Sequence, residues 1–196
     1  MINMIWPIPI YSEKIDYTFK EEDIPSEWTS NYSNKLSKNK YILDTHFSGL
    51  KEKFQDHVKL YVNEICPPMN ENLEFPITQS WISLTEPDKH HKVHCHSNSY
   101  ISGVFYLKTI ENDCVIYLDP LSKIKNKINF PLKKDNIFSA SVAQVGVKDN
   151  ILLLFPSWLD HEVSPNMSQM DRYSLAFNVW IKGEIGEIDT LSKLIL

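Results

Sequence analysis

The chain of 196 residues carries a net charge of −5 and is 42% hydrophobic. This length and apolar content suit one folded domain with a sizeable core, and the acidic balance argues against nucleic acid as a partner. There is no apolar run of about 18 residues, so no membrane span is expected. Three widely spaced cysteines, Cys66, Cys95 and Cys114, and the lack of a signal peptide favour a reducing cytoplasm.

The first 75 residues are expected to form an extended and helical support. Apolar and proline residues alternate over residues 1–12, which suits an extended segment, while residues 13–40 are polar and irregular. From Thr45 to Ile65 apolar residues recur at steps of three and four, which predicts an amphipathic helix with Thr45 as its N-cap. Cys66-Pro67-Pro68 should end that helix.

After residue 75 the hydrophobic pattern changes to a period of two or to short apolar runs, which indicates strands. One helix followed by many short strands predicts a mainly β fold, a sandwich or jelly roll with the helix packed outside. We therefore expect a single domain over residues 1–196, with its jelly-roll core at residues 76–182 and a solvated lysine-rich loop at residues 122–136. The expected strands are Ile77–Leu84, Val93–His96, Tyr100–Ile110, Val115–Leu118, Phe138–Val145, Asn150–Phe155 and Tyr173–Ile181.

Histidines cluster in the middle of the chain, where His94 and His96 stand two residues apart. In a strand such residues point to the same face, so both imidazoles would project to one side. A facial metal site needs a third ligand, and His161, also at the start of an expected strand, is the candidate. A His-x-His pair alone also fits ordinary solvated histidines.

Arg172 is the only arginine among the 20 basic residues of the chain. A guanidinium can hold a carboxylate through two parallel hydrogen bonds, which the ammonium of lysine cannot do. Its uniqueness therefore favours a carboxylate-binding role, with an ordinary surface ion pair as the alternative.

These residues lie within segments that match a known family, and the matching segments are Trp81-Ile82-Ser83, His94 to Leu107, Asp119-Pro120, Phe155 to Asn166 and Arg172 to Asn178. From Gln79 to Trp180 the chain resembles the Fe(II)- and 2-oxoglutarate-dependent oxygenases, and most closely a poorly characterised group of microbial and phage-encoded members. The resemblance implies a double-stranded β-helix that holds Fe(II) near one mouth.

The resemblance also implies roles for individual residues. His94 and His161 match two iron ligands of the family, while His96 stands where a carboxylate is common. Glu86 and Asp88 precede the cluster and could supply a carboxylate instead.

The resemblance also assigns residues to 2-oxoglutarate. Arg172 matches the arginine that binds the distal carboxylate of 2-oxoglutarate, and Ser174 shares its strand face. Tyr106 resembles a tyrosine that donates its hydroxyl to the same distal carboxylate; alternatively, it is an ordinary core aromatic. Asn98 could contact the 1-carboxylate of 2-oxoglutarate; alternatively, it is an ordinary turn residue.

The implied activity is hydroxylation of a small molecule or protein side chain with Fe(II), O2 and 2-oxoglutarate, releasing succinate and CO2. Two other functions fit the same residues. One is a non-catalytic jelly roll that binds a metal or ligand, and the other is a three-histidine dioxygenase of the cupin type that does not use 2-oxoglutarate. The prime substrate and the oligomeric state cannot be predicted from these residues.

Overall fold

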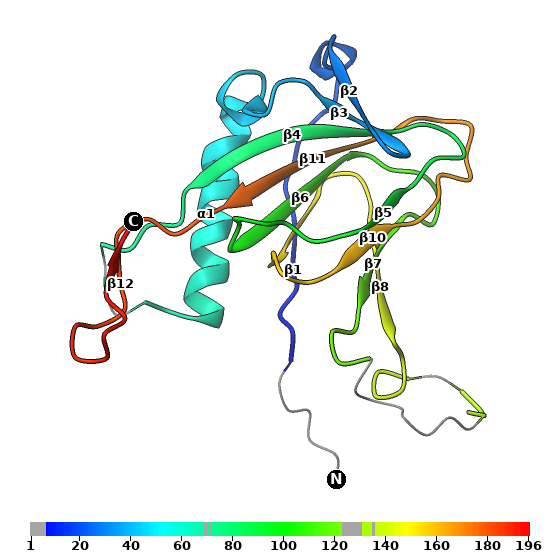
Figure 1. Ribbon diagram of the computed structural model, residues 1–196. Helices are drawn as coiled ribbons and strands as arrows, with labels where there is room; N and C mark the ends of the chain where they lie inside the picture. The colour runs from blue at the N-terminus through cyan, green and yellow to red at the C-terminus, as the bar shows by residue number, and fades with distance from the viewer. Residues whose placement is uncertain (1–6, 69, 71, 123–130, 135) are drawn as a thin grey trace.

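Two antiparallel sheets form the body of the protein in the computed structural model, which describes residues 7–68, 70, 72–122, 131–134 and 136–196 (Figure 1). The large sheet has the strand order β1-β9-β6-β11-β4-β3-β2, and the small sheet has the order β5-β10-β7-β8. Each ladder between neighbouring strands is antiparallel, which confirms the predicted mainly β jelly roll. The strands of the large sheet are β1 (Tyr11–Lys14), β2 (Trp28–Asn31), β3 (Asn34–Ser37), β4 (Ile77–Thr85), β6 (Ile101–Lys108), β9 (Ile151–Pro156) and β11 (Arg172–Val179). Those of the small sheet are β5 (His91–His94), β7 (Cys114–Leu118), β8 (Val142–Gly146) and β10 (His161–Val163).

A single long helix, α1 (Ser48–Ile65), covers one face of the large sheet, while the small sheet lies across the other face (Figure 1). Its apolar stripe packs on the sheet, where the Phe54 ring stacks against Phe177 with centroids 5.3 Å apart. The helix ends at Ile65, with Cys66 as its C-cap, as predicted. The predicted N-cap was wrong: Phe47 occupies that position without a side-chain hydrogen bond, because Thr45 instead closes the short 3-10 helix η2 (Ile42–Asp44).

The expectation that residues 13–40 are irregular was also wrong. Besides a short 3-10 helix, η1 (Glu21–Asp23), this segment contains β2 and β3, which pair as a hairpin. The hairpin joins the large sheet through β3, where Leu36 is opposite Ser83 of β4. The N-terminal third thus contributes strands to the sheet in addition to supporting it, and the division at residue 75 stays a prediction. Most of the loop expected at residues 122–136 lies outside the described residues.

Successive side chains along a strand point to opposite faces, so the large sheet carries a layer of buried side chains on each face. Leu175 and Phe177 of β11 face α1 and belong to the larger hydrophobic cluster. On the other side of the large sheet, a second cluster that includes Tyr117 and Phe155 packs between the two sheets. The β11 residues between the helix-facing ones, Arg172 and Ser174 among them, line a cavity between the sheets. This strand therefore belongs to the core on one side and to the candidate site on the other.

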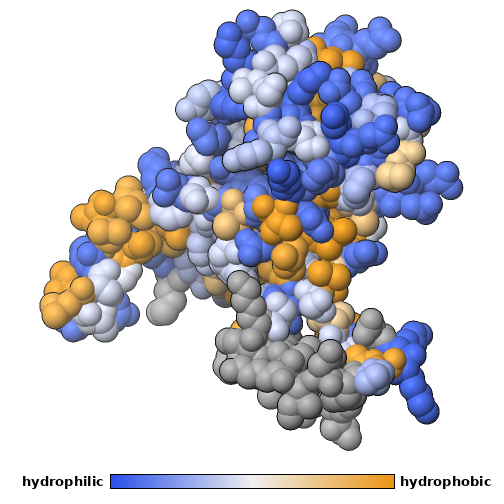
Figure 2. Space-filling view, turned by 45° about the vertical axis from the view of Figure 1, so that its right-hand side comes forward, coloured by the Kyte–Doolittle hydropathy of each residue, from blue (hydrophilic) through white to orange (hydrophobic). Residues whose placement is uncertain are grey.

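Polar side chains cover much of the face shown in Figure 2. Hydrophobic residues gather on the projecting C-terminal hairpin of β12 (Glu184–Ile185) and β13 (Leu194–Ile195), where Leu191 is 95% exposed. Within the described residues, α1 is not apolar enough to span a membrane and no other helix is long enough.

Candidate metal centre

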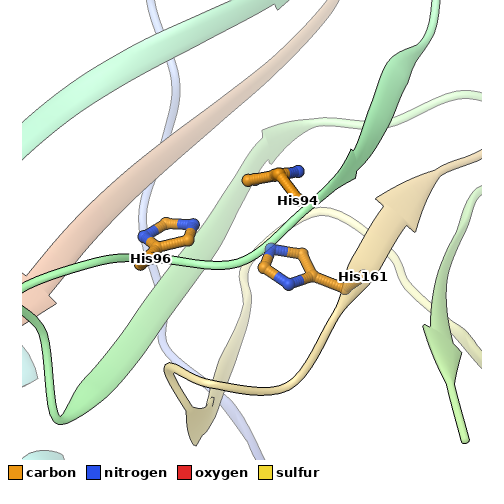
Figure 3. Close-up of side chains that lie close together, drawn as sticks. All are labelled: His94, His96 and His161. Atoms are coloured by element: carbon orange, nitrogen blue, oxygen red, sulfur yellow. The ribbon is translucent and has the colours of Figure 1, made fainter. Parts of the chain in front are cut away.

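Three histidines meet at one end of the space between the sheets, His94 and His96 from one segment and His161 from another (Figure 3). His94 closes β5 and is opposite His161, the first residue of β10. His96 lies just beyond β5, where its backbone N–H donates to the carbonyl of Ser157 at 3.0 Å. One ligand nitrogen from each imidazole lies within 4.8 Å of the other two. The structure therefore brings together the three residues predicted as metal ligands.

The hydrogen bonds of these histidines place the ring proton on Nδ1 and leave Nε2 able to bind a metal ion. The Nδ1 atoms of His94 and His161 each donate to a backbone carbonyl, that of Lys92 at 2.8 Å and that of Leu159 at 2.9 Å. The Nδ1 atom of His96 donates to the amide oxygen of Asn178 at 2.7 Å. Because each Nδ1 carries the proton, each Nε2 keeps a lone pair, and such outer hydrogen bonds are typical of histidines that bind metals.

Burial keeps the imidazoles neutral. It lowers the pKa of His161 to about 3, with a smaller effect from the nearby His94, and it also lowers the pKa of His94 and of His96. Divalent metals bind neutral imidazole, so these side chains fit a metal ion without first losing a proton near neutral pH. Of the carboxylates suggested as alternative ligands, Glu86 pairs with Lys35 at 2.6 Å and Asp88 is exposed.

A small cavity of about 30 Å³ runs between the sheets from these histidines to Arg172. Arg172, Ser174 and Tyr106 all line it, since Ser174 of β11 pairs with Tyr106 of β6. Asn98, by contrast, sits on an exposed turn with a φ of 53° and is not among the described residues that line this cavity. Three of the four residues predicted to hold an organic cofactor therefore lie together beside the metal centre.

Arg172 is buried in an ion pair that the sequence did not reveal. Its Nη1 atom donates to Oδ1 of Asp113 at 2.8 Å and to the carbonyl of Ser164 at 3.0 Å. The two side chains are 3% and 0% exposed, and burial raises the pKa of Asp113 against the opposing effect of the guanidinium. The Nη2 atom of Arg172 and Oδ2 of Asp113 are buried without a partner among the described residues. The Nη1 end of the guanidinium is thus already hydrogen-bonded, and the Nη2 end remains available to a ligand.

His91 is a second residue that sequence analysis missed. The sequence assigned it no role, but the pairing of β5 with β10 shifts register between His91 and His94, and His91 turns inward. Its ring stacks on that of His94 with centroids 4.0 Å apart, and burial lowers its pKa to about 3. His91 lines both the inner cavity and a larger outer cavity, so it forms part of the wall between them.

Comparisons with known proteins agree with this geometry. A family model described as "Putative 2OG-Fe(II) oxygenase" matches residues 79–178, just over half of the chain. No curated protein matches the sequence. Among solved structures, an oxidoreductase of the 2OG-Fe(II) oxygenase family from Burkholderia pseudomallei is 10% identical with a TM-score of 0.52, covering 78% of this chain and 71% of its own. HygX from Streptomyces hygroscopicus, crystallised with nickel, 2-oxoglutarate and hygromycin B, is 13% identical with a TM-score of 0.53, covering 88% of this chain and 83% of its own.

Proposed function

The chain belongs to the 2OG-Fe(II) oxygenase family, and from this premise we propose that it hydroxylates a C–H bond of a small molecule or side chain. In that reaction R–H, O2 and 2-oxoglutarate become R–OH, succinate and CO2. The observation that carries the proposal is the convergence of three neutral imidazoles next to a cavity that also contains a buried arginine. Three unpaired cysteines, in the described part of the chain, support a reducing cytoplasm as its location.

His94, His96 and His161 would hold the iron through their Nε2 atoms. The bound iron and 2-oxoglutarate supply the oxidising chemistry, and the protein supplies binding, orientation and exclusion of water. Three neutral imidazoles leave the charge of the metal less compensated than two imidazoles and a carboxylate would. This favours anionic ligands at the open positions, and a carboxylate of 2-oxoglutarate is such a ligand.

Arg172 would bind the distal carboxylate of 2-oxoglutarate through Nη2, while Asp113 and the Ser164 carbonyl hold the guanidinium in place through Nη1. Ser174 and Tyr106 line the same cavity and can each offer a hydroxyl to that carboxylate. A cavity of about 30 Å³ holds roughly one water molecule, which is less room than a five-carbon diacid needs. We therefore propose that His91, which lines both the inner and the outer cavity, moves aside when 2-oxoglutarate binds.

The ion pair of Arg172 with Asp113 favours a second candidate, a non-catalytic jelly roll that binds a metal. In that reading Arg172 only stabilises the fold, since a buried arginine that already has a carboxylate does not need a second one. A dioxygenase of the cupin type would also keep the metal and would not need 2-oxoglutarate.

One set of measurements separates these functions. Wild-type protein and His161→Ala are titrated with Ni(II), then with 2-oxoglutarate, and succinate is measured after addition of Fe(II) and O2. The oxygenase should bind Ni(II), then 2-oxoglutarate only in the presence of metal, and release succinate, whereas His161→Ala should lose all three properties. Metal binding without 2-oxoglutarate binding would support the non-catalytic protein. Oxygen consumption without succinate, with a cell extract as the source of substrate, would support the cupin type.

A further inference from the structure

The outer cavity has a volume of about 440 Å³, shares His94 and His96 with the inner cavity, and does not have Arg172 among the described residues that line it. This size falls within the range of pockets that bind small organic molecules. His94 and His96 line it from the metal side, and Asn31, Tyr32 and Leu36 of the β2–β3 hairpin line it from the N-terminal part of the chain. A molecule in this cavity would therefore lie against the metal centre without occupying the space next to Arg172.

The hairpin that forms this wall is fixed in place by side-chain contacts. The hydroxyl of Ser33, at its tip, lies 3.2 Å from Nδ1 of His90 and accepts the backbone N–H of His90 at 3.3 Å. Lys35 on β3 forms an ion pair with Glu86, just after β4, at 2.6 Å. These contacts join the hairpin to the segment that leads into β5. The cavity is therefore largely formed before a ligand arrives, which reduces the cost of ordering on binding.

Two aromatic side chains line this cavity and do not belong to the hydrophobic core. Tyr32 is 92% exposed and has a φ of 49°, a backbone conformation that residues other than glycine, asparagine and aspartate rarely adopt. Trp81, on β4, packs one face of its indole on His96 with centroids 5.8 Å apart and also lines the cavity. Rigid aromatic rings give a ligand a large contact area at low entropic cost.

The charged side chain that lines the cavity, among the described residues, is the positive Lys92. The Nζ atom of Lys92 lies 4.9 Å from the centre of the Tyr32 ring, at the rim of the cavity. No aspartate or glutamate is found among the described residues that line it, although the chain as a whole is acidic. A lysine ammonium attracts anions as a point charge without demanding one geometry. The cavity thus disfavours cationic ligands and offers one site for a negative group.

Building on the proposed function, we propose that this cavity is the prime-substrate site and that its substrate is a small anionic molecule with a flat apolar part. The flat part would contact Trp81 and Tyr32, and the negative group would lie at Lys92. This arrangement would leave an apolar carbon of the substrate facing His94 and His96, where the metal is held.

The test compares three probes with the same ring and different charge: 3-phenylpropanoate, 3-phenylpropanamide and 3-phenylpropylamine. Each is titrated by saturation-transfer NMR into protein loaded with Zn(II) and 2-oxoglutarate, so that binding is measured without turnover. We expect the carboxylate to bind most tightly and the amine least. In Lys92→Gln the carboxylate should bind about two- to fivefold more weakly, the range for an exposed ion pair, and the amide should be unaffected. Lys89→Gln is the matched control, because Lys89 is exposed nearby but does not line the cavity.

A second variant tests the ring. Tyr32→Asn suits the positive φ and removes the aromatic side chain, so the fold should persist while all three probes bind more weakly. Equal affinity for the three probes, a preference for the amine, or no binding of any probe while 2-oxoglutarate still binds would overturn this inference and leave the proposed function intact. Failure of 2-oxoglutarate itself to bind would instead contradict the proposed function.

Discussion

Replacing Arg172 with lysine tests whether this side chain anchors 2-oxoglutarate, because the change keeps the positive charge and removes the fork. The guanidinium makes two hydrogen bonds through Nη1, to Asp113 and to the carbonyl of Ser164, while Nη2 has no partner in the part of the chain that the structure describes. A lysine could remain near Asp113 with its single ammonium. It could not hold Asp113 and a ligand carboxylate in two fixed directions at once.

The size of the effect follows from the bond that is lost. A hydrogen bond to a charged group contributes about 1.5–3 kcal/mol, so the affinity for 2-oxoglutarate should fall roughly ten- to a hundredfold. The affinity for metal should stay nearly the same, because the three imidazoles are held by Lys92, Leu159 and Asn178 and not by Arg172. Calorimetric titration of Ni(II) into metal-free protein, followed by titration of 2-oxoglutarate into the Ni(II)-loaded protein, measures both quantities in wild type and Arg172→Lys.

Asp113→Asn is the companion variant. It leaves the buried guanidinium with a neutral partner, which should lower the stability of the ligand-free protein. A bound carboxylate would restore the missing negative charge, so 2-oxoglutarate should raise the melting temperature of this variant by more than that of the wild type. Equal affinity for 2-oxoglutarate in wild type and Arg172→Lys, with no extra stabilisation of Asp113→Asn, would refute the anchoring role and favour the non-catalytic jelly roll.

Two further variants test the support of the metal centre and of the sheet. Asn178→Ala removes the acceptor that orients His96, so metal affinity should fall about ten- to a hundredfold in a chelator competition assay, and unchanged affinity would contradict the proposed role of His96. Gly103→Ala would place a methyl group against the ring of Phe177 on the opposite side of the large sheet from the metal, so the free energy of unfolding in urea should fall by about 1–3 kcal/mol with metal affinity unchanged. Gly49→Ala is its control, because an added Cβ there meets nothing within 4 Å and alanine favours the helix, so this change should not destabilise the protein.

Local patterns in the sequence were sufficient for four consecutive strands of the large sheet and for the group of three histidines that the structure brings together. A period of two or a short apolar run predicted β4, β6, β9 and β11 to within a few residues at each end, because strands buried on one or both faces carry these patterns. The family model confirms the resemblance inferred from the residues around His94, His161 and Arg172, and with it Fe(II) and 2-oxoglutarate as the cofactors of the family. The roles of the individual residues stay predictions that the variants above can test.

What the sequence did not reveal depends on contacts between distant segments. Asp113 stands 59 residues before Arg172 and precedes β7 in a turn, so no spacing or motif links the two. His91 faces inward only because the register of β5 against β10 shifts, and such a shift leaves no trace in the order of residues. The β2–β3 hairpin was missed because its polar residues carry little hydrophobic pattern, and its place on the sheet is fixed by pairing with β4.

The alternation of side chains along β11 separates residues that pack in the core from residues that face the candidate site. Tyr173, Leu175 and Phe177 pack toward α1, and their replacement should affect stability first. Ser174 and Ala176, which alternate with them, line the inner cavity, and Asn178 accepts a hydrogen bond from His96, so replacement of these residues should affect binding first. Arg172 is the exception to this separation, because its pairing with Asp113 makes it part of the buried structure and its free Nη2 makes it part of the site. A variant at this position is therefore informative only when stability, metal affinity and 2-oxoglutarate affinity are measured on the same protein.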